Sequence, residues 1–276
     1  MKKGSFSTFL LILVLLAGLS LLLYPTFSDY WNSMHQTQAI AKYSEDVSKL
    51  EKVDYSGIWS DAIAYNQKLA LLDDPLVRST DLDEAYPTLL NLGGSGIMGY
   101  IDIPSIGVSL PIYHGTEENV LQVAVGHITW SSLPTGGENT HCLLSAHRGL
   151  PSAKLFTDLD QLRERDFFTL RILNELLTYE IDQILIVEPH DIAALHIEEG
   201  KDLCTLITCT PYGVNTHRLL VRGHRVENNE QTEAVRVLAD AIEVDPIAVA
   251  VIIVGPILIV LLIITSLFDR SKRKRH

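Results

Sequence analysis

Basic residues and cysteines are both scarce in this chain of 276 residues. Its 22 Lys and Arg face 34 Asp and Glu, which gives a formal net charge of −12. A nucleic-acid-binding protein needs a basic footprint to contact phosphates, so the charge argues against that class of protein. Three cysteines are too few for a disulfide scaffold, and their odd number leaves at least one without an intramolecular partner. Apolar residues, in contrast, make up 47% of the chain, which excludes a disordered protein.

The apolar residues are concentrated in two runs at the ends of the chain. Residues 6–24 follow Lys2 and Lys3, and residues 247–268 precede a tail with five basic residues. A helix needs about 20 apolar residues to cross a bilayer. We therefore predict a membrane anchor within residues 1–28 and a transmembrane helix at 247–268. A cleaved signal peptide is the alternative for the first run, but no clear Ala-x-Ala site follows it, which favours an uncleaved anchor.

The charges at both ends predict how the chain lies across the membrane. The outer flank of each run is basic, so the positive-inside rule places both termini in the cytoplasm, the second as a tail over 269–276. The whole chain carries −12 and the two ends together carry +6, so the stretch between them carries −18. This acidic middle is expected outside the cell, on the plasma membrane.

The middle of the chain divides into a helical arm over 29–95, a strand-rich body over 96–228 and a polar linker over 229–246. Apolar residues three or four apart from Asp29 to Ala70 predict two amphipathic helices in the arm. Pro75 then breaks the pattern. Residues 93–99 match G-x-G-x-x-G, but a dinucleotide site opens a helix, whereas these glycines open a strand-like run. We interpret them as a linker.

The body consists of short strand-like runs separated by turn residues. Their number and spacing predict an antiparallel or mixed β-barrel. The clearest runs are 108–113, 141–147, 167–173, 177–187, 203–209 and 217–225.

Three residues of the body have side chains suited to nucleophilic chemistry. Cys209 and His147 each end a strand-like run, and Arg218 lies in the last one. A thiolate can attack a carbonyl, an imidazole can protonate the leaving amine, and a guanidinium can stabilise the oxyanion. Together they indicate acyl transfer. Because strand side chains alternate between faces, Cys204 should face away from Cys209, and Cys142 away from His147, as structural free thiols.

A zinc site is the metal-binding alternative. His141, His147, Cys204 and Cys209 are suitable ligand types, but no C-x-x-C or H-E-x-x-H spacing occurs, and the two cysteines should face opposite ways. We therefore expect no metal.

The body from residue 91 to 226 resembles the sortases, and specifically the class C, pilus-assembling sortases of Gram-positive bacteria. Residues 205–209 (T-L-I-T-C) match the motif that carries the family's cysteine. Residues 145–149 (S-A-H-R-G) and 215–219 (N-T-H-R-L) match the segments that carry its histidine and arginine. Further matching segments are 97–101, 110–115, 150–156 and 208–213. Two anchors and a helical arm are also similar to class C architecture.

The resemblance implies a mainly β fold, an eight-stranded sortase barrel. Carried over motif by motif, Cys209 is the nucleophile, His147 the acid/base and Arg218 the stabiliser of oxyanion or substrate. The implied reaction cleaves an LPxTG-like sorting signal of a pilin through a thioester on Cys209, and a lysine amine of the next pilin then attacks. The implied partners are pilin subunits and the membrane, and neither a metal nor an organic cofactor is implied.

Class C sortases often carry a lid with an Asp-Pro-aromatic motif over the active site. Residues 73–78 lie where this lid is expected, with Asp74 and Pro75 matching and Leu76 replacing the aromatic residue. The resemblance thus implies an Asp74–Arg218 pair, with Leu76 over Cys209. A plain proline turn between two helices is the other interpretation.

Three other functions stay open at this point. They are a membrane-anchored cysteine protease that only hydrolyses, a housekeeping-type sortase that anchors proteins to the cell wall, and a non-enzymatic membrane scaffold with a sortase-like barrel. The reaction product distinguishes the first two from pilin polymerisation, and labelling of Cys209 tests the third.

Overall fold

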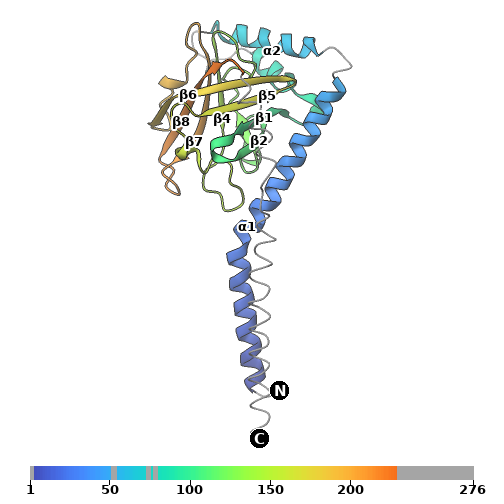
Figure 1. Ribbon diagram of the computed structural model, residues 1–276, viewed down its shortest axis with the longest axis vertical. Coiled ribbons are helices and arrows are strands. Elements are labelled where there is room, and N and C mark those ends of the chain that lie inside the picture. Colours follow the sequence, from blue (N-terminus) through green and yellow to red (C-terminus); the bar gives the residue numbers. More distant parts are fainter. Residues whose placement is uncertain (1–2, 51–54, 73–75, 77–79, 229–276) are drawn as a thin grey trace.

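A computed structural model describes residues 3–50, 55–72, 76 and 80–228, and it shows a barrel mounted on a long helix (Figure 1). The predicted linker 229–246, transmembrane helix 247–268 and tail 269–276 lie outside these residues, as do Asp74 and Pro75.

The long helix α1 (Lys3–Leu50) joins the N-terminal apolar run and the first predicted arm helix into one continuous element with Pro25 inside it. The apolar part of this helix has a mean hydropathy of 2.4. No residue in that apolar part is buried by the rest of the protein. By length and composition the helix is able to cross a membrane. Its C-terminal half packs on the barrel instead, and there the buried Tyr43 hydroxyl donates to the carbonyl of Met98 at 2.7 Å.

The second arm helix, α2 (Ser56–Leu69), confirms the other helical prediction and lies across one end of the barrel (Figure 1). Its buried face carries Ala62, Tyr65 and Leu69. Asn66 in the same face donates to the carbonyl of Leu133 at 2.9 Å and accepts from its backbone N–H at 2.7 Å. The arm continues through α3 (Thr80–Ala85) and two short 3₁₀ turns. The linker predicted over 93–99 is shorter than expected, because the second turn includes Gly93 and Gly94 and the first strand begins at Ile97.

Eight strands close into a barrel in the order β1-β2-β3-β4-β7-β8-β6-β5, which confirms the eight-stranded prediction. The pairing is mixed, because β2 with β3 and β4 with β7 are parallel while the other pairs are antiparallel. The short helix α4 (Glu118–Leu121) connects β2 to β3. The strands are β1 (Ile97–Ile103), β2 (Val108–His114), β3 (Val125–His127), β4 (Thr140–Ser145), β5 (Phe167–Ile172), β6 (Glu175–Val187), β7 (Asp202–Thr210) and β8 (His217–Val226).

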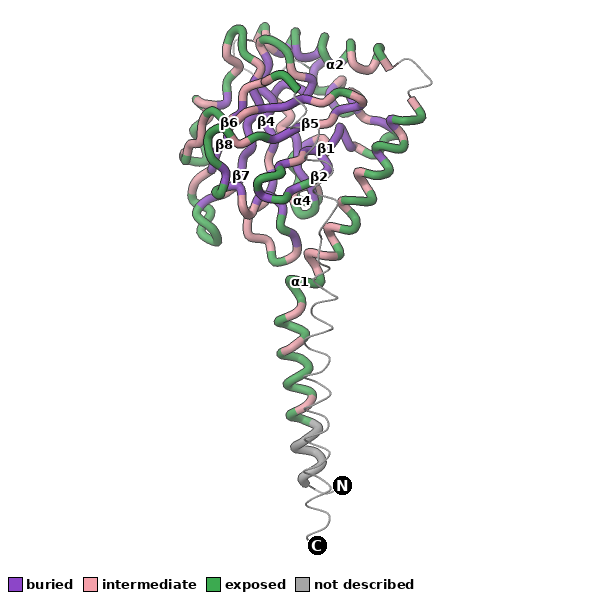
Figure 2. The backbone as a smooth tube through the Cα atoms, viewed as in Figure 1, coloured by how far each residue is buried: buried purple, intermediate pink, exposed green. Residues whose placement is uncertain are grey.

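The alternation of side chains along β4 and β7 separates two hydrophobic clusters, and Figure 2 shows the buried residues gathered in the barrel strands. The main core fills the barrel and includes Cys142 and Cys204, which are register partners and free buried thiols. Burial raises the pKa of the Cys204 thiol well above its usual value. The smaller cluster, with Leu143, Ile207 and Leu220, lies on the opposite face of the same strands. The prediction that Cys142 and Cys204 are structural free thiols agrees with this placement.

Candidate active site

The ends of β4, β7 and β8 bring Cys209, His147 and Arg218 to one place on the barrel. Cys209 on β7 is the direct register partner of Arg218 on β8. Ser145 at the end of β4 is the partner of Ile207, so His147, two residues further along, lies level with Cys209. Cys209 and Arg218 share the face of the smaller hydrophobic cluster, because strand side chains alternate. The strand predicted to reach His147 ends at Ser145, and the histidine lies in the following loop.

Two hydrogen bonds keep the histidine loop aligned with the cysteine strand. The backbone N–H of Ala146 donates to the carbonyl of Ile207 at 3.2 Å, which extends the β4–β7 ladder by one residue. The buried hydroxyl of Thr208 donates to the carbonyl of Ala146 at 2.8 Å. The threonine before Cys209 therefore crosslinks the two segments that carry the nucleophile and the imidazole.

The imidazole of His147 has a carboxylate neighbour that the sequence did not reveal. Its Nε2 lies 3.6 Å from Oε2 of Glu118, which sits on α4 and is largely exposed. Within the described part of the chain, this buried Nε2 has no hydrogen-bond partner. It is thus free to exchange a proton with a bound substrate, and Glu118 is the carboxylate nearest to it on α4.

The guanidinium of Arg218 is oriented by the turn that precedes β8. Its Nη1 donates to the backbone carbonyls of His217 at 3.1 Å and of Asn215 at 3.4 Å. These two bonds to Nη1 orient the plane of the guanidinium. Its other two nitrogens carry further N–H donors. A planar donor set on the register partner of the cysteine is suited to binding a developing oxyanion.

A second arginine, Arg148, connects the histidine loop to the end of β7. Its side chain is only 9% exposed, pairs with Asp160 and donates to the hydroxyl of Thr210 at 3.3 Å. A buried charge with a carboxylate partner is costly to break, so this contact ties the histidine loop to the residue after Cys209.

Gly149 and Tyr212 form a further contact between the two loops. Gly149 has a φ of +76°, and a Cβ at this position would lie 2.7 Å from the ring of Tyr212. Replacing Gly149 with alanine would therefore push Tyr212 and the β7–β8 turn away from the histidine loop. Because small displacements of reacting groups are costly, we expect the rate of thioester formation to fall by about 10- to 100-fold.

Gly213→Ala is the matched control for this prediction. Gly213 has a φ of +74°, but a Cβ there would meet no atom within 4 Å. Both variants carry the same backbone strain, whereas only Gly149→Ala carries the clash. Rates and melting temperatures measured on both separate the two causes, and equal losses of activity would show that backbone strain alone is responsible.

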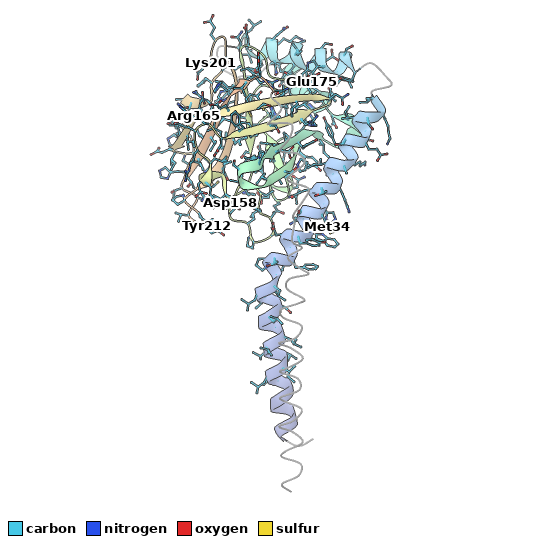
Figure 3. The ribbon with its side chains drawn as sticks, viewed as in Figure 1. Met34, Asp158, Arg165, Glu175, Lys201 and Tyr212 are labelled. Atoms are coloured by element: carbon cyan, nitrogen blue, oxygen red, sulfur yellow. The ribbon has the colours of Figure 1, made fainter. Side chains whose placement is uncertain are left out.

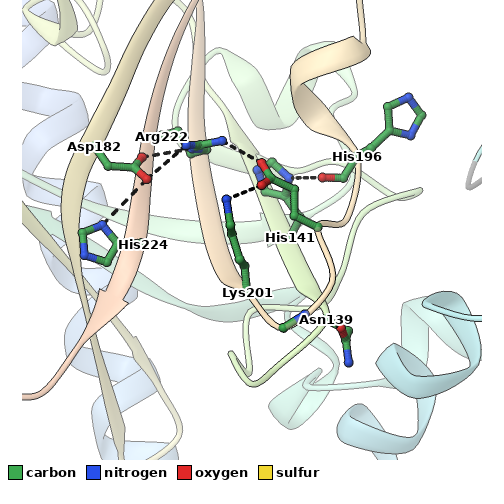
Figure 4. Close-up of polar contacts among 9 residues, drawn as sticks. Asn139, His141, Asp182, His196, Lys201, Arg222 and His224 are labelled. Carbon is green, nitrogen blue, oxygen red and sulfur yellow. Dashed lines mark hydrogen bonds and ion pairs between the residues drawn. The ribbon is translucent and has the colours of Figure 1, made fainter.

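The far end of the same face carries a polar network instead of a reactive group. His141 on β4 shares a hydrogen bond of 2.7 Å with Thr205 on β7, and its Nδ1 donates to the carbonyl of His196 at 2.8 Å. Arg222 on β8 forms a bidentate pair with Asp182 and reaches Glu198 at 2.8 Å (Figure 4). His196 and Glu198 belong to the β6–β7 connection, so the network pins this segment against the catalytic face.

The network makes stability depend on pH through His141. Burial lowers the pKa of His141 from its usual 6.5 to about 4. The folded protein therefore binds fewer protons than the unfolded chain between these values. The contribution of His141 to the folding free energy is fully present above pH 6.5. It is lost as the pH drops toward 4, by about 3 kcal/mol in total.

Denaturant unfolding at several pH values measures this effect, with His141→Gln as the comparison. The variant is less stable near neutral pH but should lose most of the slope between pH 6.5 and 4. An unchanged slope in the variant would assign the pH dependence to other groups.

The four residues weighed as zinc ligands are not gathered into one site. Cys204 points into the barrel while Cys209 lies on the other face, and His141 is engaged by Thr205 and His196. Among the residues that the structure describes, no three His, Cys, Asp or Glu side chains form a group able to hold a metal ion.

The predicted lid is represented by a single described residue. Leu76 is 52% exposed. Asp74 and Pro75 lie outside the described residues, so the Asp74–Arg218 pair stays a prediction.

Comparison with known proteins places this arrangement in a family. The family model described as Sortase domain matches residues 101–226. The crystal structure of sortase C1 from Streptococcus agalactiae is 49% identical, with a TM-score of 0.67 over 70% of this chain and 100% of that one. The crystal structure of Streptococcus pneumoniae sortase C is 41% identical, with a TM-score of 0.62 over 69% of this chain and 97% of that one. That structure has been related to pilin substrate specificity. Sortase D from Bacillus subtilis is 32% identical over 131 residues, which span 46% of this chain and 63% of that protein.

Proposed function

The chain belongs to the sortase family of cysteine transpeptidases, and from this premise we propose that it is a class C enzyme that polymerises pilins. In this proposal it cleaves an LPxTG-like sorting signal between Thr and Gly and transfers the acyl group to a lysine amine of the next pilin. The register pairing of Cys209 with Arg218, level with His147, is the observation that carries the proposal. The class C identity of its structural neighbours at 41–49% identity supports the choice of class.

The proposed mechanism assigns one role to each of the three side chains. The Cys209 thiolate attacks the threonine carbonyl, and Arg218 donates hydrogen bonds to the resulting oxyanion. His147 gives its proton to the departing glycine amine, and a thioester remains on Cys209. The lysine amine then attacks the thioester and loses a proton to His147. The thiolate leaves and an isopeptide bond has formed, so the enzyme returns to its starting state.

The position in the cell forms part of the same proposal. The unburied apolar half of α1 is consistent with membrane anchoring. We propose that the barrel lies outside the plasma membrane and that both termini are cytoplasmic. The net negative charge of the body is compatible with lysine-bearing pilins as partners.

Mass spectrometry of the products tests the reaction. The full chain, in detergent or lipid, is incubated with a purified pilin that carries an LPxTG-like sorting signal and acceptor lysines. Lysine-linked multimers are expected. A free threonine carboxylate as the only product would instead identify a hydrolase, and transfer to a cell-wall peptide alone would identify a housekeeping-type sortase. No reaction and no labelling at Cys209 would support the non-enzymatic scaffold.

We also propose that residues 73–78 form a lid. In this proposal Asp74 pairs with Arg218 and Leu76 covers Cys209. A lid inhibits only by the free energy that it gains on closing. Leucine offers less contact area than an aromatic ring and no π-face for the guanidinium, so closure should be weak.

Two substitutions test the lid. Asp74→Ala should raise the rate at which a small thiol reagent modifies Cys209 by up to about tenfold, which corresponds to about 1.4 kcal/mol of closing free energy. Leu76→Trp should lower the same rate. If both variants are modified at the rate of the unaltered protein, Asp74-Pro75-Leu76 is only a turn.

A further inference from the structure

Aromatic residues mark where α1 leaves the bilayer. Residues 4–28 carry no charged side chain, and Asp29 is the first charge after Lys3. Tyr24, Phe27 and Trp31 follow each other at the end of this stretch and just beyond it, and each is more than half exposed. The rings of Phe27 and Trp31 stack at 6.5 Å. Exposed Trp and Tyr at the end of an apolar helix are typical of the membrane–water interface, so the outer surface of the bilayer lies close to residues 24–31.

Three hydrogen bonds attach the barrel to α1 at the upper end of these aromatic residues and just beyond it. The Asp29 carboxylate accepts from the backbone N–H of Lys154 at 2.7 Å. Asn32 donates to the carbonyl of Ser152 at 2.7 Å, and Gln36 donates to that of Val123 at 2.8 Å. The three contacts lie on successive turns of one helix, so they fix both the height and the orientation of the barrel on α1.

The attached end of the barrel is the catalytic end. Ser152 and Lys154 belong to the loop that follows His147, and Val123 leads into β3, which pairs with the end of β4. Figure 3 shows Tyr212 and Asp158 at this lower end, at about the level of Met34 of α1, while Lys201 and Glu175 lie at the opposite end. Since Tyr212 follows Cys209 by three residues, the thiol lies on the side of the barrel that faces the bilayer.

We propose that α1 holds Cys209 at a fixed short height above the membrane and thereby selects which bonds the enzyme can reach. Asp29 and Gln36 lie five and twelve residues beyond Tyr24, which at 1.5 Å per helical residue corresponds to heights of about 8 to 18 Å. An extended peptide covers this height with about three to six residues. Among substrates anchored in the same bilayer, α1 thus selects those whose scissile bond lies about three to six residues outside the membrane span. This inference rests on the proposed function for the bond that is cleaved.

A spacer series measures this distance directly. The full chain is placed in phosphatidylcholine nanodiscs with reporters in which an LPxTG-like motif is joined to a model transmembrane helix by Gly/Ser spacers of 1 to 12 residues. Processing should be nearly absent for the shortest spacers and should begin at about three to six residues. It should then decline slowly, because the effective concentration of a flexible tether falls gradually with its length.

A helical insertion then tests whether α1 sets the distance. Seven residues inserted between Ser28 and Asp29 raise the barrel by about 10 Å and turn it by only about 20°. The onset should move to spacers about three residues longer. The same seven residues between Lys3 and Gly4 lengthen α1 on the other side of the membrane, and the onset should not move.

A soluble peptide with the same motif separates the two proposals. If the unaltered protein and the two insertion variants all process this peptide equally while the insertion after Ser28 leaves the onset unchanged, α1 does not set the distance. In that case the proposed function stands. If no protein processes the soluble peptide or any reporter, the proposed function itself fails.

Discussion

Cys209→Ala is expected to abolish both the thioester and the lysine-linked product while the barrel stays folded. Removing a nucleophile typically lowers turnover by far more than about 10³-fold, because binding and oxyanion stabilisation alone remain. Cys209 is only partly buried at the end of β7, so its replacement should cost at most about 1 kcal/mol of folding free energy. Intact-mass analysis for the acyl-enzyme and a thermal melt measure the two effects.

Cys204→Ala supplies the control, since it lies five residues earlier on the same strand. Its side chain is fully buried in the main core, and its loss should destabilise the barrel by about 1–2 kcal/mol. Activity below the melting temperature should survive. Cys209→Ala should thus lose activity but keep its stability, whereas Cys204→Ala should lose stability but keep its activity. Multimers formed by Cys209→Ala at an undiminished rate would show that this thiol takes no part in the mechanism.

Strand alternation explains why the faces of these cysteines were predictable. Cys204 and Cys209 differ by an odd number of residues on one strand, so any strand that contains both must place them on opposite sides. The same parity holds for Cys142 and the segment leading to His147. These predictions needed no knowledge of how the strands pair.

Pairing and loop contacts were not predictable in the same way. The partnership of Cys209 with Arg218 depends on the geometry of the turn over 211–216, and hydrophobic period alone does not set that register. Strand β3 has three residues, too few for a periodic signal. Glu118 sits on a four-residue helix, 29 positions before His147, and only the fold brings the two together. The Arg148–Asp160 and Gly149–Tyr212 contacts have the same origin.

Arg218→Lys is expected to lower turnover by about 10²–10³-fold even though the positive charge is kept. In the structure, one guanidinium nitrogen is held by two backbone carbonyls of the turn, and Arg218 is the direct register partner of Cys209. A lysine ammonium is a compact point charge without this fork, so it cannot satisfy the turn and a substrate oxyanion together. The loss should appear in kcat more than in KM, because the oxyanion forms only in the transition state.

Arg225→Lys is the matched control on the same strand. Arg225 lies seven residues further along β8 and donates to the carbonyl of Leu176, at the end of the barrel away from Cys209. The identical exchange there should leave turnover within about twofold, because it touches no reacting group. Steady-state kinetics with a sorting-signal peptide, together with melting temperatures, compare the two variants. Wild-type turnover in Arg218→Lys would show that charge alone is sufficient at this position. An equal loss in Arg225→Lys would mean that the effect comes from strand β8 as a whole, and that no special donor geometry acts at the thiol.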